Sequence, residues 1–100
     1  MTTITLRYFA GCPNWRIAER RLRDVLGELG AADVDLVHER VESPDDAARL
    51  GFRGSPTILV DGRDPFPGGG DVGLSCRVYR TEAGTEGAPS LEQLRAALAP

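Results

Sequence analysis

The fold is decided at residues 4–15, which read Ile-Thr-Leu-Arg-Tyr-Phe-Ala-Gly-Cys-Pro-Asn-Trp. The first six residues are rich in β-branched and aromatic side chains, which predicts a short strand over Ile4–Phe9, central in its sheet. Pro13 suits the first position of a helix, where its missing N–H costs nothing. This strand, turn and helix start put Cys12 at the point where the first helix begins.

The helix that follows is expected to end at Gly30, since glycine commonly closes helices. Its apolar face is built at three- and four-residue steps by Trp15, Ala18, Leu22, Val25, Leu26 and Leu29. Charged residues fill the opposite face, which is most simply a solvated surface.

The remaining elements follow from similar signals. Strands are predicted over Val34–Val41, Thr57–Val60 and Cys76–Arg80, because these stretches are short and rich in strand-forming residues. Ser43 and Pro44 predict the start of a short helix over Asp45–Leu50, ended by Gly51. Ser90 with Gln93 predicts a capping box for a last helix. Leu91, Leu94, Ala97 and Leu98 form its apolar face.

The order is therefore β-α-β-α-β-β-α within one domain, residues 1–100. We expect an α/β fold with a mixed four-stranded sheet and helices on both faces. Asp61-Gly62 predicts a turn, and Arg63–Ser75, with Gly68-Gly69-Gly70, is expected to be a long loop.

Composition excludes some classes of partner. The net charge of −3 argues against nucleic acid, which rewards a basic surface. No apolar stretch approaches the ~20 residues that span a bilayer, so we expect no membrane association. Residues 1–7 lack a basic region followed by an apolar run, so we expect no signal peptide and a cytoplasmic location. Nothing in the sequence predicts an oligomeric state or a cofactor.

Two motifs carry a resemblance over nearly the whole chain: Gly11–Trp15 after the first strand and Gly54–Thr57 before the third. Together with the element order, they resemble the thioredoxin-like superfamily, with its thioredoxin and glutaredoxin fold. More narrowly, these motifs together with Asp64–Phe66 and Ser75–Arg80 resemble small actinobacterial thioredoxin-like proteins, some of which are labelled alkylmercury lyase. The family's dithiol motif is Cys-x-x-Cys, and Trp15 stands here at its fourth position. The usual resolving cysteine is therefore missing.

Cys12 is the candidate nucleophile. A thiolate is the reactive form of cysteine, and a helix N-terminus favours negative charge. Pro13 would open the helix, and Arg16, one turn on, would add a cationic neighbour. The alternative is a small buried residue that happens to precede a helix.

Cys76, the other cysteine, leaves two placements open. If it opens a fourth strand in a standard hairpin, it lies at the far end of the sheet from Cys12. If the long loop runs back along the sheet, it carries Cys76 toward Cys12. The two would then form a redox pair or a two-thiolate site for a soft metal.

The resemblance implies a role for the loop before the third strand. Pro56 would be a cis proline beside the active sulfur, with Thr57 following, and the Ser55 backbone would bind an extended thiol peptide such as glutathione. The alternative is a proline that only shapes a turn. Trp15 is expected to pack in the core or, alternatively, to shield the thiol.

Other polar residues are expected at the surface. His38 is predicted to be a surface or partly buried residue rather than a catalytic one. Arg77 and Arg80 are expected to be solvated charges at a sheet edge.

Three functions remain open. The first is a monothiol oxidoreductase in which Cys12 attacks a disulfide and a low-molecular-weight thiol resolves the intermediate, with a protein disulfide as the alternative partner. The second is binding of a thiophilic metal or an organomercurial by Cys12 and Cys76, with Asp64 or Asp71 as a proton donor for carbon–mercury cleavage. The third is a redox-silent interaction module. Whether the chain is an enzyme stays open.

Overall fold

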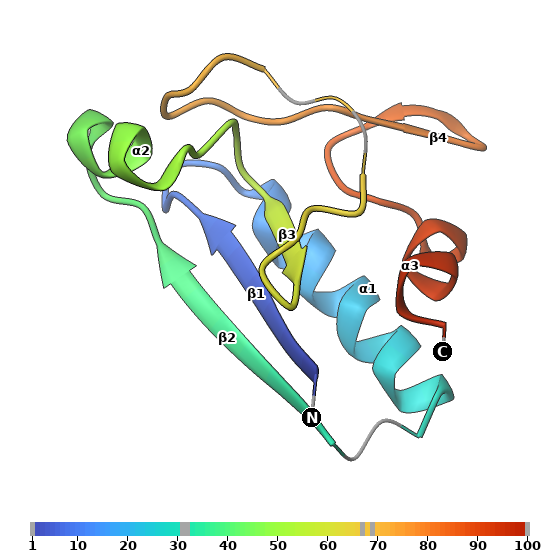
Figure 1. Cartoon of the computed structure of the whole chain (residues 1–100). Helices are drawn as coiled ribbons and strands as arrows, with labels where there is room; N and C mark the ends of the chain where they lie inside the picture. Colours follow the sequence, from blue (N-terminus) through green and yellow to red (C-terminus); the bar gives the residue numbers. More distant parts are fainter. Residues whose placement is uncertain (1, 31–32, 67, 69, 100) are drawn as a thin grey trace.

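A three-stranded sheet in the order β2-β1-β3 organises the chain (Figure 1). The computed structural model describes residues 2–30, 33–66, 68 and 70–99. The elements in chain order are β1 (Thr2–Tyr8), α1 (Asn14–Glu28), β2 (Val34–Arg40), α2 (Pro44–Leu50), β3 (Thr57–Val60), β4 (Tyr79–Thr81), β5 (Gly84–Glu86) and α3 (Leu91–Leu98).

The central position predicted for the first strand is confirmed. β1 pairs in parallel with β2 and antiparallel with β3, so the sheet is mixed. Ile4 and Leu6 alternate onto one face and are fully buried there, as strand geometry requires. They join α1 and α3 in the main core, which contains Ile4, Leu6, Ala18, Leu22, Val25, Ile58, Ala88 and Leu94.

The predicted four-stranded sheet is not observed. Within the residues that the structure describes, β4 pairs only with β5, in a separate two-stranded sheet, and not with β3. The long connection after β3 runs back to the segment between α2 and β3, where Gly70 and Gly73 donate to the carbonyls of Arg53 and Phe52, before the chain reaches β4 (Figure 1). β5 was missed because Gly84–Glu86 is short and polar, which gives no strand signal.

The helix ends largely follow the predicted signals. The Ser43 hydroxyl accepts from the N–H of Asp46, and Gly51 adopts the left-handed conformation after α2. The predicted capping box of Ser90 and Gln93 is confirmed at α3. α1 differs by one residue, because Pro13 is its N-cap rather than its first helical residue.

The helices do not cover both faces of the sheet equally. α1 and α3 pack together on the face of Ile4 and Leu6. α2 lies beyond the carboxyl end of β2 and covers only that end (Figure 1), around a small core of Val41, Ala47 and Phe52. In the described part of the chain, none of the helices has the length and apolarity that crossing a bilayer needs.

The connection after β3 begins with the predicted turn, and Asp61 takes a positive φ of 50° there. Most of the predicted Arg63–Ser75 loop is irregular, as expected, while Arg63 forms a single bridge back to Val60. Pro67 and Gly69, which belong to that predicted loop, lie outside the described residues.

Candidate functional site

The β1–α1 junction buries the first cysteine. Cys12 has no exposed surface, and its N–H donates to the carbonyl of Phe9 at 3.1 Å, which closes the turn after β1. Because Pro13 is the N-cap, Cys12 lies one residue before the cap and does not cap the helix itself. The predicted placement at the helix start is thus correct to within one residue.

The loop before β3 lies directly beside this junction. β3 runs antiparallel to β1 with Arg7 opposite Thr57, so Ser55 comes level with Phe9. The Phe9 N–H donates to Ser55 Oγ at 3.4 Å, and the Cys12 thiol donates to the Ser55 carbonyl at 3.5 Å. The bond between Ser55 and Pro56 is cis, as predicted. A second contact within the loop is the donation from Thr57 Oγ1 to the Gly54 carbonyl at 2.6 Å.

The segment around Cys76 pairs with this loop. Ser55 and Cys76 form an isolated parallel bridge, in which the Ser55 N–H donates to Ser75 and the Arg77 N–H donates to Ser55, both at 2.8 Å. The prediction of a strand over Cys76–Arg80 is wrong at its start, because β4 begins only at Tyr79. The residues just before β4 pair with Ser55 and so form part of the cysteine site.

This bridge brings the two sulfurs into contact. Cys76 Sγ donates to Cys12 Sγ at 3.0 Å, which resolves the two placements that the sequence left open. Both cysteines are free thiols; Cys12 is buried and Cys76 is exposed. A disulfide bond is about 2.05 Å long, so roughly 1 Å of movement separates the contact from a bond.

The contact between the two thiols changes the pKa of the exposed cysteine, Cys76. The hydrogen bond to Cys12 raises the pKa of Cys76 above its ordinary value, with further contributions from burial and from the charge of Cys12. Cys76 therefore holds its proton toward Cys12, whose sulfur accepts it.

A buried arginine anchors the Cys76 segment. The Arg77 side chain is only 1% exposed, so the prediction of a solvated edge charge is wrong for this residue. Its guanidinium donates to Asp64 at 2.5 Å and to the Phe66 carbonyl at 3.1 Å, and lies 4.7 Å from the Tyr79 ring centroid. Its Nε has no hydrogen-bond partner within the described residues. Arg80 is exposed, as predicted.

Two further contacts hold the same segment. The Tyr79 hydroxyl donates to the Pro56 carbonyl, and burial raises the pKa of Tyr79 far above its ordinary value. Gly54 has a φ of +123°, and a Cβ there would lie 2.9 Å from the Cβ of Arg77. Only glycine therefore permits this close approach without strain.

The Ser55 backbone is already occupied. The resemblance assigned its N–H and C=O to an outside thiol peptide, but residues 75–77 of the chain itself take both groups. The site is thus closed on the side of the cis proline by the chain's own cysteine-bearing segment.

The predicted binding residues around the start of α1 make contacts with other side chains. For Trp15 and Arg16 these are aromatic and cation–π contacts. Trp15 stacks on Tyr8 with ring centroids 4.3 Å apart and packs against the main core, in line with its expected packing role. The exposed Arg16 lies 5.2 Å from the Trp15 ring centroid. Pro13 is exposed at the N-cap. His38 is exposed, as expected, and pairs with Glu19.

The two cysteines have few other metal-binding side chains near them among the described residues. The described residues contain no cluster of three or more histidine, cysteine or acidic side chains suited to a metal ion.

No protein-family model and no curated protein matches the chain. The thioredoxin-like relationship therefore stays a prediction, and the function has to be argued from the site.

Proposed function

We propose that Cys12 and Cys76 form a dithiol–disulfide pair that carries out thiol–disulfide exchange. The observation that carries this proposal is the 3.0 Å contact between two free sulfurs from segments 64 residues apart in the chain. Such a pair needs no Cys-x-x-Cys motif, because the tertiary structure places the second thiol beside Cys12. The monothiol alternative, with an outside thiol resolving Cys12, stays a prediction that the following test separates.

Exposure assigns different tasks to the two sulfurs. Cys76 is the sulfur that an outside molecule can reach, while Cys12 has no exposed surface. Cys76 loses its proton, attacks a substrate disulfide and forms a mixed disulfide, and the substrate's first thiolate leaves and takes up a proton. Cys12 then loses its proton, attacks Cys76 Sγ and displaces the second substrate thiolate, which takes up a proton. The pair ends as a disulfide, and the substrate has gained the two electrons.

The reverse sequence restores the dithiol. A low-molecular-weight thiol attacks the exposed sulfur of Cys76, Cys12 leaves as the thiolate, and a second thiol releases Cys76. Because the pKa of Cys76 is raised, little of it is ionised at neutral pH, so its attack accelerates as pH rises through the thiol range. The cytoplasm, where thiols keep such disulfides transient, is the location that we propose.

Trapping the mixed disulfide tests the division of tasks. When reduced Cys12→Ser is treated with glutathione disulfide, a mixed disulfide between Cys76 and one glutathione should accumulate, because no second thiol resolves it. Intact mass detects this adduct. Reduced Cys76→Ser should form adducts far more slowly, since its remaining sulfur is buried. The wild-type protein should instead lose the mass of two hydrogen atoms as the internal disulfide closes. Equal adduct formation by the two variants, or adduct without internal disulfide in the wild type, contradicts the paired mechanism.

A second candidate is binding of a soft metal ion, because two free thiols lie in contact. Two bonds of ~2.3 Å in a linear site need sulfurs roughly 4.6 Å apart, so the thiols would have to separate by more than 1 Å. Carbon–mercury cleavage further needs a proton donor, and Asp64 is engaged by Arg77. The geometry thus favours a disulfide over a metal. A redox-silent module is the remaining alternative, and it predicts no exchange in the trapping experiment.

A further inference from the structure

The Cys76 segment has one free backbone edge. Ser55 uses the carbonyl of Ser75 and the N–H of Arg77, both on the inner side of the segment. In an extended chain the N–H and C=O of Cys76 then point to the opposite side. Among the described residues, these two groups have no hydrogen-bond partner. They form an unpaired donor and acceptor beside the exposed sulfur, which is the pattern of a sheet edge open to strand addition.

Two apolar side chains are exposed near Cys76, where Ser75 is exposed as well. Leu74 and Val78 lie two residues either side of Cys76 and are 37% and 60% exposed. The next residues in the alternation, Arg77 and Tyr79, are buried. Side chains two apart in an extended segment share a face, so Cys76 and Val78 point to the same side. Leu74 lies just before this stretch, in a tight turn in which the Ser75 N–H donates to the Gly73 carbonyl at 3.2 Å.

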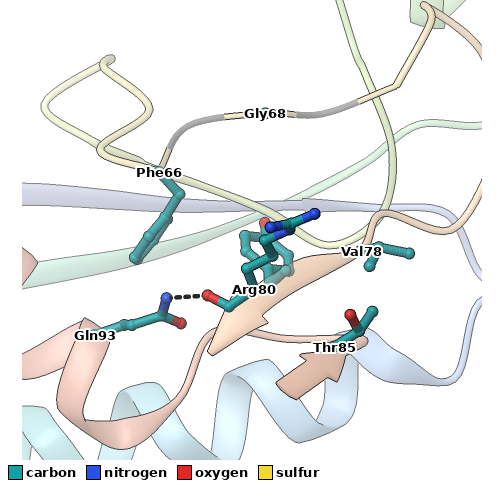
Figure 2. Close-up of a pocket in the computed structure, with 7 residues that line it drawn as sticks. Phe66, Gly68, Val78, Arg80, Thr85 and Gln93 are labelled. Atoms are coloured by element: carbon teal, nitrogen blue, oxygen red, sulfur yellow. Dashed lines mark hydrogen bonds between the residues drawn. The ribbon is translucent and has the colours of Figure 1, made fainter. Parts of the chain in front are cut away.

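A cavity continues this surface beyond Val78. It has a volume of about 470 Å³ and is lined by Phe66, Gly68, Val78, Tyr79, Arg80, Thr85 and Gln93. Figure 2 shows Phe66 and Gln93 at one end, Val78 and Thr85 at the other, and Arg80 between them. Arg80 is the only charged residue of this lining, and its guanidinium has no ion-pair partner in the described part of the chain. The cavity thus suits an apolar side chain followed by a carboxylate.

From this edge we infer that the substrate is an extended polypeptide segment that carries the reactive disulfide, rather than a small thiol compound. The segment adds as a strand to the free edge of residues 76–78, with aliphatic residues beside its cysteine and an acidic residue toward Arg80. Side chains opposite one another on paired strands have Cβ atoms ~5 Å apart, roughly 1 Å more than a disulfide spans, so a small adjustment brings the sulfurs into reach. This inference rests on the proposed exchange activity.

The experiment compares three mixed disulfides that share one chromogenic leaving thiol. The first is an extended peptide with aliphatic residues two positions either side of its cysteine and an acidic residue beyond. In the second peptide, serine replaces the aliphatic residues and the acid. The third is glutathione. With reduced wild-type protein, the first peptide should react at least about tenfold faster than the other two, which is ~1.4 kcal/mol in the transition state.

Two further arms identify the free edge. Methylating backbone amides of the first peptide in two alternating registers should slow the reaction for one register only, because only one set faces the edge. Val78→Asp should reduce the ratio of the first peptide's rate to that of glutathione. Val37→Asp makes the same substitution at an exposed valine of β2, away from the edge, and should leave this ratio unchanged. Since the peptide series uses the wild-type protein, a misfolded variant does not decide the outcome.

The outcomes separate the two proposals. Equal rates for all three compounds, or equal slowing by both methylation registers, overturn the inference and leave the exchange activity standing. If none of the three compounds reacts, the exchange activity fails and the inference falls with it.

Discussion

The two cysteines lie in contact, yet their segments are held in place by different kinds of interaction. Cys12 follows β1 and precedes α1, and the turn around it is closed by a bond to Phe9, three residues away. Cys76 lies in an irregular segment held by contacts to Ser55, Asp64 and Pro56. The first placement is local and rigid, whereas the second depends on long-range anchors. A site of this kind can be loosened on one side without disturbing the other.

The largest expected effect comes from joining the two segments covalently. A disulfide between residues 64 apart should stabilise the protein by about 4 kcal/mol through the loop-closure entropy of the unfolded chain. Oxidised wild-type protein should therefore unfold roughly 15–30 °C above the reduced form in a calorimetric scan. Cys12→Ser and Cys76→Ser should show no dependence on reductant. Identical melting of oxidised and reduced wild type would show that the bond does not form in the native fold.

A smaller effect is expected from removing the anchor of the Cys76 segment. Arg77→Met keeps the buried stem but removes the hydrogen bonds to Asp64 and Phe66, which should cost about 2 kcal/mol in urea unfolding. Closure of the internal disulfide, followed by intact mass, should also slow because Cys76 is held less firmly. Arg80→Met is the matched control, since this exposed arginine should change stability by less than about 0.5 kcal/mol. If both variants behave alike, Arg77 is not the anchor.

The smallest effect concerns the proton shared by the sulfurs. The pKa of Cys76 is raised first by its hydrogen bond to Cys12, so Cys12→Ala should lower it and speed alkylation of Cys76 at pH 8. In Cys76→Ala, alkylation of Cys12 should stay slow because that sulfur is buried. An unchanged alkylation rate of Cys76 in Cys12→Ala would mean that the contact does not hold the proton.

The same raised pKa carries a stability consequence with a definite sign. Because Cys76 binds its proton more tightly in the folded than in the unfolded state, its contribution is complete below the ordinary thiol pKa of ~8.5. It is lost as pH rises through the folded-state value. The reduced wild type should therefore lose stability above about pH 8.5 relative to Cys76→Ala, in urea unfolding at a series of pH values.

The elements that could be predicted are those encoded by neighbouring residues. Ser43 with Pro44, and Ser90 with Gln93, set helix starts through bonds spanning three residues, and both were found where the sequence placed them. The cis bond before Pro56 was expected from the resemblance carried by Gly54–Thr57, and it is observed. The polar strand Gly84–Glu86 was not, because its pairing with β4 leaves no hydrophobic pattern to detect.

Cys12 at the start of the first helix is what the amino-acid sequence determined by itself, since a strand, a glycine turn and a proline are local signals. That Cys76 meets it was decided only by the tertiary structure. The contact needs the path of the connection after β3, the bridge to Ser55 and the burial of Arg77 against Asp64. The partners that hold the Cys76 segment, Ser55 and Asp64, both lie far from Cys76 in the chain. Loop closure over such distances is driven by the summed contacts of the folded state, and no stretch of sequence around Cys76 encodes them.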